Sequence, residues 1–156
     1  MTTKPLAVSK LENLKKADQV YLFIRNADQF LEAARVLNES TPFHFFPAFY
    51  LAHHSVELAL KVHLILLGAK PKDLRDLNHD LQALAEDFEK RAETKGYPFR
   101  LGPRDIMAIE LEGGHYAGKS FEYPDPNLLS IAPIGIWLSM AETLIREAKS
   151  MIGNHT

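Results

Sequence analysis

Five polar side chains share one narrow stripe of an otherwise apolar segment, residues 49–68. At about 100° per residue in an α-helix, all of them fall within about 100° of arc. They are Tyr50, His53, His54, Glu57 and Lys61. Imidazole, carboxylate, ammonium and phenol groups can transfer protons, pair with anions and stack on rings. A polar stripe on an apolar helix indicates water, a partner chain or a functional cleft at that face.

The histidines first suggest a metal site. The chain has 7 His and no Cys, and His53 and Glu57 lie one helical turn apart. However, the sequence has no His-Glu-x-x-His, no paired Glu-x-x-His and no cluster of carboxylates. A metal site needs three or four convergent ligands, and only two are placed. We therefore predict that the histidines bond to backbone or carboxylate groups, with no metal and no other cofactor.

A second constellation is formed by Arg75, His79 and Asp80. An imidazole can move the proton of a ribose 2′-hydroxyl while a guanidinium neutralises charge that develops on the phosphate. His79 and Asp80 can equally lie in the first turn of a helix and contact the central helix through Glu57 or Lys61. Both interpretations stay open.

A third constellation lies in residues 113–127, where three glycines and two prolines predict an ordered loop. Tyr116 and Tyr123 flank Lys119, an arrangement that can stack a base and contact a phosphate. The same tyrosines can instead close one end of a helical bundle, with their hydroxyl groups bonded to the backbone.

Helices must position these residues, because apolar side chains recur at three- and four-residue steps and no segment alternates with period two. Helices are expected from Ser9 to about Leu37, over residues 49–68 and 79–95, over a short stretch that starts at Pro103 and ends at Gly113 and Gly114, and from about 127 or 131 to 151. Gly68 and Gly96 are expected to stop their helices. The fold class predicted is all-α, an up-and-down type bundle of four long helices plus one or two short ones, as a single domain over residues 1–156.

Composition and the absence of certain motifs exclude several classes of function. A formal net charge of −2 gives no bulk attraction for nucleic acid or anionic membranes. The first residues lack the apolar run of a signal peptide, and the longest apolar run is too short to cross a bilayer. We expect a soluble, cytoplasmic protein that does not associate with membranes. No nucleotide-binding glycine loop or esterase nucleophile motif is present.

Several motifs, in this order and spacing, resemble the HEPN family (higher eukaryotes and prokaryotes nucleotide-binding) over roughly residues 45–126. They are His53-x-x-x-Glu57-Leu-Ala-Leu-Lys61, Gly68, Lys72-x-Leu74, His79-Asp80-Leu81-x-x-Leu84 and Tyr116-x-x-Lys119-x-x-x-Tyr123-Pro124. The resemblance implies a helical bundle that commonly forms a homodimer through its long helices. It also implies one of two activities: metal-independent RNA cleavage in toxin–antitoxin, phage-defence or RNA-processing systems, or binding of nucleotides and of nucleotidyltransferase partners.

Catalytic members of the family carry Arg, then four to six residues, then His, whereas three residues separate Arg75 from His79 here. The strict ribonuclease motif is therefore absent, and His79 matches the family's His-Asp-Leu motif instead. The leading hypothesis is a non-catalytic homodimer that binds a nucleotide, RNA or a protein partner. Its surface would combine the stripe at Tyr50, His53, His54, Glu57 and Lys61 with His79, Asp80, Tyr116, Lys119 and Tyr123.

Two alternatives remain. One is a metal-independent endoribonuclease of a toxin–antitoxin or defence type, with His79 and Arg75 as catalytic residues and an antitoxin as partner. The other is a purely structural module, in which the stripe pairs with its copy across a symmetric dimer.

Overall fold

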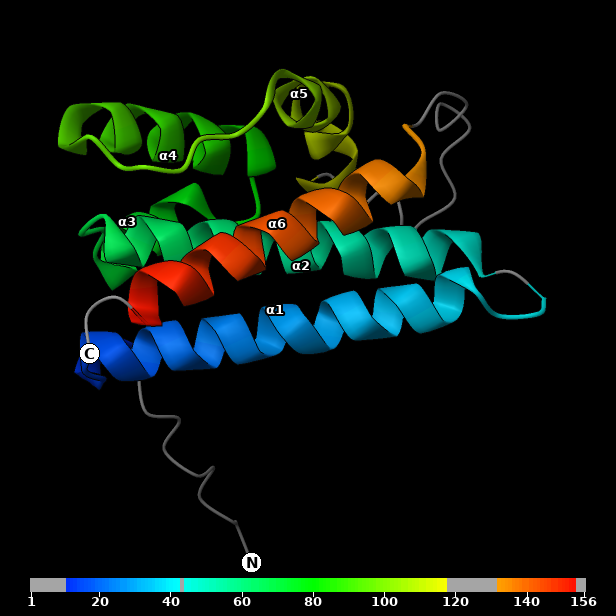
Figure 1. Cartoon of the computed structure of the whole chain (residues 1–156), viewed down its shortest axis with the longest axis horizontal. Helices are drawn as coiled ribbons and strands as arrows, with labels where there is room; N and C mark the ends of the chain where they lie inside the picture. Colours follow the sequence, from blue (N-terminus) through cyan, green and yellow to red (C-terminus); the bar gives the residue numbers. More distant parts are fainter. Residues whose placement is uncertain (1–10, 43, 118–131, 154–156) are drawn as a thin grey trace, which may run out of the picture.

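The computed structural model describes residues 11–42, 44–117 and 132–153, with the backbone alone for 114–117. These parts of the chain are helical and contain no strand (Figure 1). The elements are η1 (Leu11–Asn13), α1 (Lys16–Asn38), α2 (Phe45–Leu66), α3 (Pro71–Leu77), α4 (Leu81–Lys95), α5 (Pro103–Ala117) and α6 (Ile134–Gly153). The all-α bundle predicted from apolar periodicity is confirmed.

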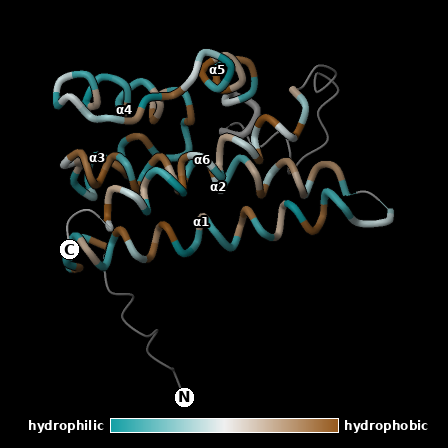
Figure 2. Tube along the Cα trace, in the orientation of Figure 1, coloured by the Kyte–Doolittle hydropathy of each residue, from teal (hydrophilic) through white to brown (hydrophobic). Residues whose placement is uncertain are grey.

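Helix α2 is the centre of the fold. It runs antiparallel to α1 along most of its length, while α6 crosses it and α4 packs on it from another side (Figure 1). Helix α1 alternates between brown and teal, as expected of a helix with one face toward the core and one toward solvent (Figure 2). Because neighbours surround α2, even its polar residues His53, Glu57 and Lys61 are buried. A polar group buried in this way must find partners inside the protein.

The corner between α3 and α4 differs from the sequence prediction. The sequence predicts a helix that starts at 79, but α4 begins at Leu81, and Asn78, with φ 51° and ψ −124°, forms a reverse turn with His79. The turn is closed by the Asp80 backbone N–H, which donates to the Leu77 carbonyl at 3.1 Å. Asp80 is the residue that caps α4, since its carboxylate accepts from the Ala83 N–H at 3.0 Å. This turn places His79 at the corner.

Helix α5 also differs, because it continues past Gly113 and Gly114 to Ala117 rather than ending at the glycines. Gly113 serves packing: a Cβ atom there would lie 3.3 Å from Leu81 Cβ and 3.6 Å from the Gln82 backbone nitrogen. Glycine thus lets α5 approach the start of α4 closely. The predicted start of the first helix at Ser9 lies outside the described residues, but residues 11–15 do not continue that helix as expected. They form η1 and a break, and α1 begins at Lys16. The predicted start of the last helix at 127 or 131 also lies outside the described residues, and in the described part of the chain α6 begins at Ile134.

None of the helices in the described parts of the chain is both long and apolar enough to cross a membrane.

Candidate functional site

The polar stripe of α2 divides between two separate clusters. Glu57 is the centre of the first cluster, with a side chain that is only 1% exposed. Its Oε1 atom accepts from Lys61 Nζ at 2.5 Å and lies 3.0 Å from His79 Nδ1. Its Oε2 atom lies 3.1 Å from His79 Nδ1 and 3.2 Å from His54 Nδ1. A buried carboxylate is costly without partners, and here Lys61 supplies the opposite charge from within the same helix.

His79 connects this buried cluster to the surface. Its side chain is 52% exposed, and its Nδ1 faces both oxygens of Glu57. Because a carboxylate accepts, Nδ1 carries the proton, and Nε2 lies on the opposite side of the ring. A carboxylate that orients a half-exposed imidazole in this way fixes its tautomer and its direction.

His54 and Tyr50 extend the cluster along α2. The His54 ring meets Phe30 of α1 edge-on, with ring centroids 4.4 Å apart. Tyr50 lies parallel to His54 at 6.1 Å between centroids. These contacts hold His54 so that its Nδ1 reaches Glu57, and they add aromatic surface beside the carboxylate.

A hollow of about 400 Å³ adjoins this cluster at Lys61 and Asn78. Its polar lining consists of Lys61, Arg75 and Asn78, and its apolar lining of Leu11, Phe23, Pro71 and Leu74. Arg75 Nη1 donates to Glu12 at 2.8 Å, with side chains that are 59% and 40% exposed. Arg75 therefore pairs with Glu12 rather than with Glu57 or His79.

The second cluster surrounds His53, which faces α5 and α6. His53 Nδ1 donates to the Phe49 carbonyl at 2.8 Å, and Nε2 lies 3.5 Å from Glu112 Oε2. The imidazole stacks on Trp137, with centroids 3.6 Å apart. Trp137 Nε1 donates to Glu112 Oε2 at 2.6 Å, and the Ala132 N–H donates to Glu112 Oε1. His53, Glu112 and Trp137 are fully buried, so this cluster joins α2, α5 and α6 inside the protein.

The family model of the HEPN domain matches residues 20–103, more than half of the 156 residues in the chain. The chain belongs to the HEPN domain family. Comparisons with curated proteins and with solved structures gave no match.

The HEPN match contains the whole Glu57 cluster and the hollow beside it, apart from Leu11. It ends before Glu112 and Trp137, which complete the His53 cluster. Sequence reasoning placed His53 and Glu57 on one surface and missed Glu112. A signal for Glu112 was present: it follows the buried residues Ala108 and Ile109 by four and three positions, and so shares their face of α5.

Four of the seven histidines bond to protein groups in the described parts of the chain, as predicted for all of them. Besides His53, His54 and His79, the buried His63 donates from Nε2 to the Leu144 carbonyl at 2.8 Å. Its Nδ1 lies 2.9 Å from the Tyr97 hydroxyl. Within the described residues, no group of three or more His, Cys, Asp or Glu is placed to hold a metal ion.

Asp80 lies at the corner beside His79, but its carboxylate caps α4. Tyr116 belongs to the last turn of α5, where the backbone alone is described. Lys119 and Tyr123 lie outside the described residues. The predicted contribution of the residues 113–127 to the site therefore stays a prediction.

Proposed function

We propose that this HEPN protein binds a nucleotide, free or as a unit of RNA, in the hollow beside Glu57. The observation that carries the proposal is the combination of two cations, an amide and an apolar wall around one space. A volume of about 400 Å³ lies within the roughly 300–1,000 Å³ that is typical of small-molecule sites.

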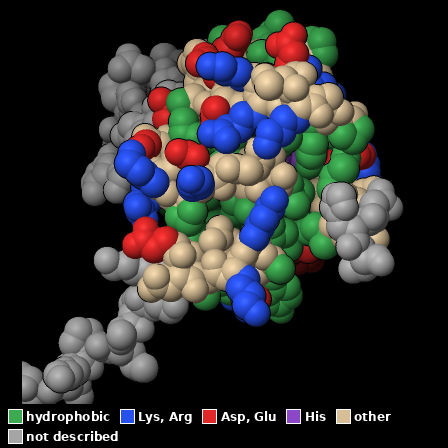
Figure 3. Space-filling view, turned by 90° about the vertical axis from the view of Figure 1, so that its left-hand side faces the viewer, with side chains coloured by type: hydrophobic (Ala, Val, Ile, Leu, Met, Phe, Trp, Pro, Cys, Tyr) green, Lys and Arg blue, Asp and Glu red, His purple; other side chains and the backbone are tan. Residues whose placement is uncertain are grey.

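Phosphate would bind at the cationic side of the hollow. The Arg75–Glu12 pair is solvent-exposed and therefore contributes little to stability, so Arg75 can exchange this carboxylate for a phosphate at small cost. A guanidinium group can donate two parallel hydrogen bonds to two oxygens of one phosphate, which favours the exchange. Lys and Arg side chains also gather on the end of the molecule where α3 lies (Figure 3). Their charge would raise the local concentration of an anion despite the negative total.

The base would bind at the apolar side. Phe23 supplies an aromatic ring, and Leu11 and Leu74 supply aliphatic surface. The Asn78 side-chain amide can both donate to and accept from a base edge. The base can therefore bind by stacking on an aromatic ring and by contact with apolar side chains, without a further polar partner from the protein.

Calorimetric titration with ATP, GTP and a short single-stranded RNA tests this proposal. We expect Arg75→Gln to weaken binding about tenfold, since a charge-assisted bond is lost. Lys72→Gln is the matched control, because Lys72 lies on the same helix and pairs with Asp76 outside the hollow. The site would be ruled out if none of the three probes bound, or if both variants lost affinity equally.

A second function is supported by the Glu57–His79 pair. A half-exposed imidazole oriented by a buried carboxylate can act as general base on a ribose 2′-hydroxyl. This function predicts cleavage of single-stranded RNA in EDTA, lost in His79→Ala. Cleavage by both proteins would point to a contaminating nuclease, and cleavage by neither would leave nucleotide binding alone.

The structural alternative has less support. His53, Glu57 and Lys61 are already buried within one chain, so they are not available to pair with a second copy.

A further inference from the structure

A narrow groove runs between α4 and α5, away from the hollow proposed to bind a nucleotide. Its volume is about 110 Å³, and its apolar floor is formed by Ala85, Ile106 and Ile109. Small-molecule sites typically occupy roughly 300–1,000 Å³. The groove is therefore too small for a nucleotide or a cofactor, but it can take one long side chain.

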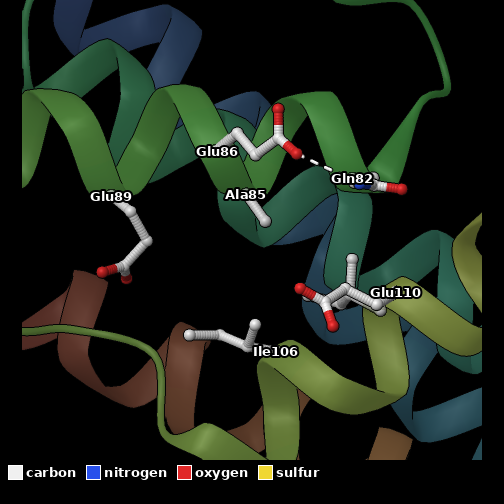
Figure 4. A pocket seen from close by; sticks show the side chains of 7 residues that line it. Gln82, Ala85, Glu86, Glu89, Ile106 and Glu110 are labelled. Atoms are coloured by element: carbon white, nitrogen blue, oxygen red, sulfur yellow. Dashed lines mark hydrogen bonds between the residues drawn. The ribbon is translucent and has the colours of Figure 1, made fainter.

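Three carboxylates rim the groove: Glu86 and Glu89 from α4, and Glu110 from α5 (Figure 4). Glu89 is neutralised by Arg100, whose Nη2 lies 2.6 Å from its Oε2. Glu86 accepts a bond from the uncharged Gln82 amide at 3.1 Å. Glu110 is exposed and forms no hydrogen bond or ion pair within the described parts of the chain. In the parts of the chain that the structure describes, Glu86 and Glu110 thus have no cationic partner.

Contacts between α4 and the segment 100–113 fix the groove at two places. At one side, Gly113 brings α5 against Leu81 at the start of α4. At the other, Glu89 accepts from the Leu101 backbone N–H at 2.9 Å and from Arg100 Nε at 2.7 Å. A site preformed in this way loses little conformational entropy when it is filled.

Helix α5 also exposes two large apolar side chains outside the groove, on the far side of Glu110 from Ile106 and Ile109. Met107 and Leu111 are 61% and 65% exposed, and they lie one helical turn apart. Glu110 lies three residues after Met107 and next to Leu111, so all three share one side of α5. Exposed apolar side chains rimmed by polar residues are typical of protein-binding surfaces.

From this geometry we propose that the α4–α5 groove binds a basic amphipathic segment of a partner protein. One Arg or Lys side chain enters the groove, with its methylene stem on Ala85, Ile106 and Ile109 and its cationic head between Glu86 and Glu110. Lys and Arg combine an apolar stem with a charged head, which matches an apolar floor with an acidic rim. Apolar residues of the same segment cover Met107 and Leu111.

A second copy of this chain is the alternative occupant. The exposed Arg104 lies one helical turn before Met107 on the same side of α5, so symmetric pairing would bring cations as well as carboxylates to the interface. The acidic rim of the groove favours a basic partner, and concentration-dependent shifts of α5 without peptide distinguish the second copy from it.

The test uses two amidated 14-residue helical peptides, one with Leu and Arg at three- and four-residue spacing and a twin in which each Arg is Gln. Binding is followed by amide NMR shifts of the full chain. We expect the Arg peptide to shift resonances of α4 and α5 around Ala85 and Glu110, and the Gln twin to bind at least tenfold more weakly.

Glu110→Lys should weaken the Arg peptide at least tenfold, and Leu111→Ser about threefold. Glu32→Lys is the matched control, because Glu32 is an exposed carboxylate on α1 that forms no hydrogen bond or ion pair in the described parts of the chain. It should leave the affinity unchanged. The proposal would be overturned if Glu110→Lys and Glu32→Lys lost affinity for the Arg peptide equally, or if the peptide shifted only resonances of other helices. It would also be overturned if the α5 resonances shifted with protein concentration in the absence of peptide.

Discussion

Glu57 Oε1 and His79 Nδ1 lie 3.0 Å apart, although Glu57 belongs to α2 and His79 to the turn between α3 and α4. The contact depends on the turn at Asn78, where φ of 51° directs the chain back toward α2. A non-glycine residue in this region of φ is strained, and such strain persists where the surrounding structure requires it. Here the strained residue directly precedes the histidine that it positions.

The turn makes a prediction for residue 78. Glycine adopts positive φ without the Cβ penalty, so Asn78→Gly should be more stable than Asn78→Ala by about 1 kcal/mol. Urea unfolding measures the difference. Substitutions at Lys72, inside α3, give the control: there Ala should be better than Gly, because the backbone is helical. If Ala were also better at position 78, the turn would not have this conformation in solution.

The Glu57–Lys61 pair makes a second prediction. Glu57→Gln leaves the ammonium of Lys61, whose side chain is 10% exposed, without its countercharge. Loss of one partner of a buried pair typically costs several kcal/mol, so we expect a loss of roughly 3 kcal/mol in the free energy of unfolding. Adding Lys61→Met removes the unpaired charge and should recover more than half of this loss.

Asp76→Asn is the comparison for that experiment, because it breaks an exposed pair with Lys72 of the same i,i+4 spacing. It should leave the unfolding midpoint nearly unchanged. A double variant that is no more stable than Glu57→Gln alone would show that Lys61 is solvated and not held by Glu57.

The position of α6 leads to a third prediction, at Glu112. Glu112→Leu leaves the Trp137 indole N–H and the Ala132 N–H without their acceptor. Unsatisfied buried donors cost about 1–3 kcal/mol each, so we expect a loss of about 3 kcal/mol. Glu112→Gln keeps one carbonyl acceptor and should cost less than half as much. Trp137 is the one tryptophan of the sequence, so its fluorescence reports unfolding directly. Equal losses in the two variants would argue against the hydrogen bonds as the cause.

The sequence predicted the helices well where apolar periodicity and helix ends agreed. Gly68 and Gly96 were expected to stop α2 and α4, and they have φ of 90° and 60° in the structure. The prediction that Gly113 ends its helix was wrong, because this glycine instead allows α5 to approach Leu81 closely. A contact between two helices leaves no local signal that separates a packing glycine from a terminating one.

The candidate site was predictable only in part, for a similar reason. Helical spacing places His53 and Glu57 on one side of α2, but it does not say which elements pack there. In the structure His53 meets Glu112 and Trp137, whereas Glu57 meets the α3–α4 corner. Both partners come from later in the chain, and their positions depend on tertiary packing rather than on local pattern.

The last prediction concerns pH and the buried His63. Burial lowers the pKa of His63 from 6.5 to about 4, against the hydrogen bond to the Leu144 carbonyl and the charge of Glu147, which raise it. The same environment raises the pKa of Tyr97 to about 12, chiefly through burial. His63 therefore stays neutral in the folded protein, donating from Nε2 to Leu144.

In the unfolded chain His63 takes up a proton below pH 6.5, while in the folded chain it does so only near pH 4. The unfolded state thus binds more protons between these values, and stability falls as the pH decreases through this window. Between pH 7 and pH 5 this histidine alone should cost about 2 kcal/mol. Urea unfolding of the wild type and His63→Phe at both pH values isolates the effect, because carboxylates and the other histidines contribute alike to both proteins. The difference in stability between the two proteins should shrink toward pH 5. A difference independent of pH would mean that His63 is protonated equally in the folded and unfolded chains.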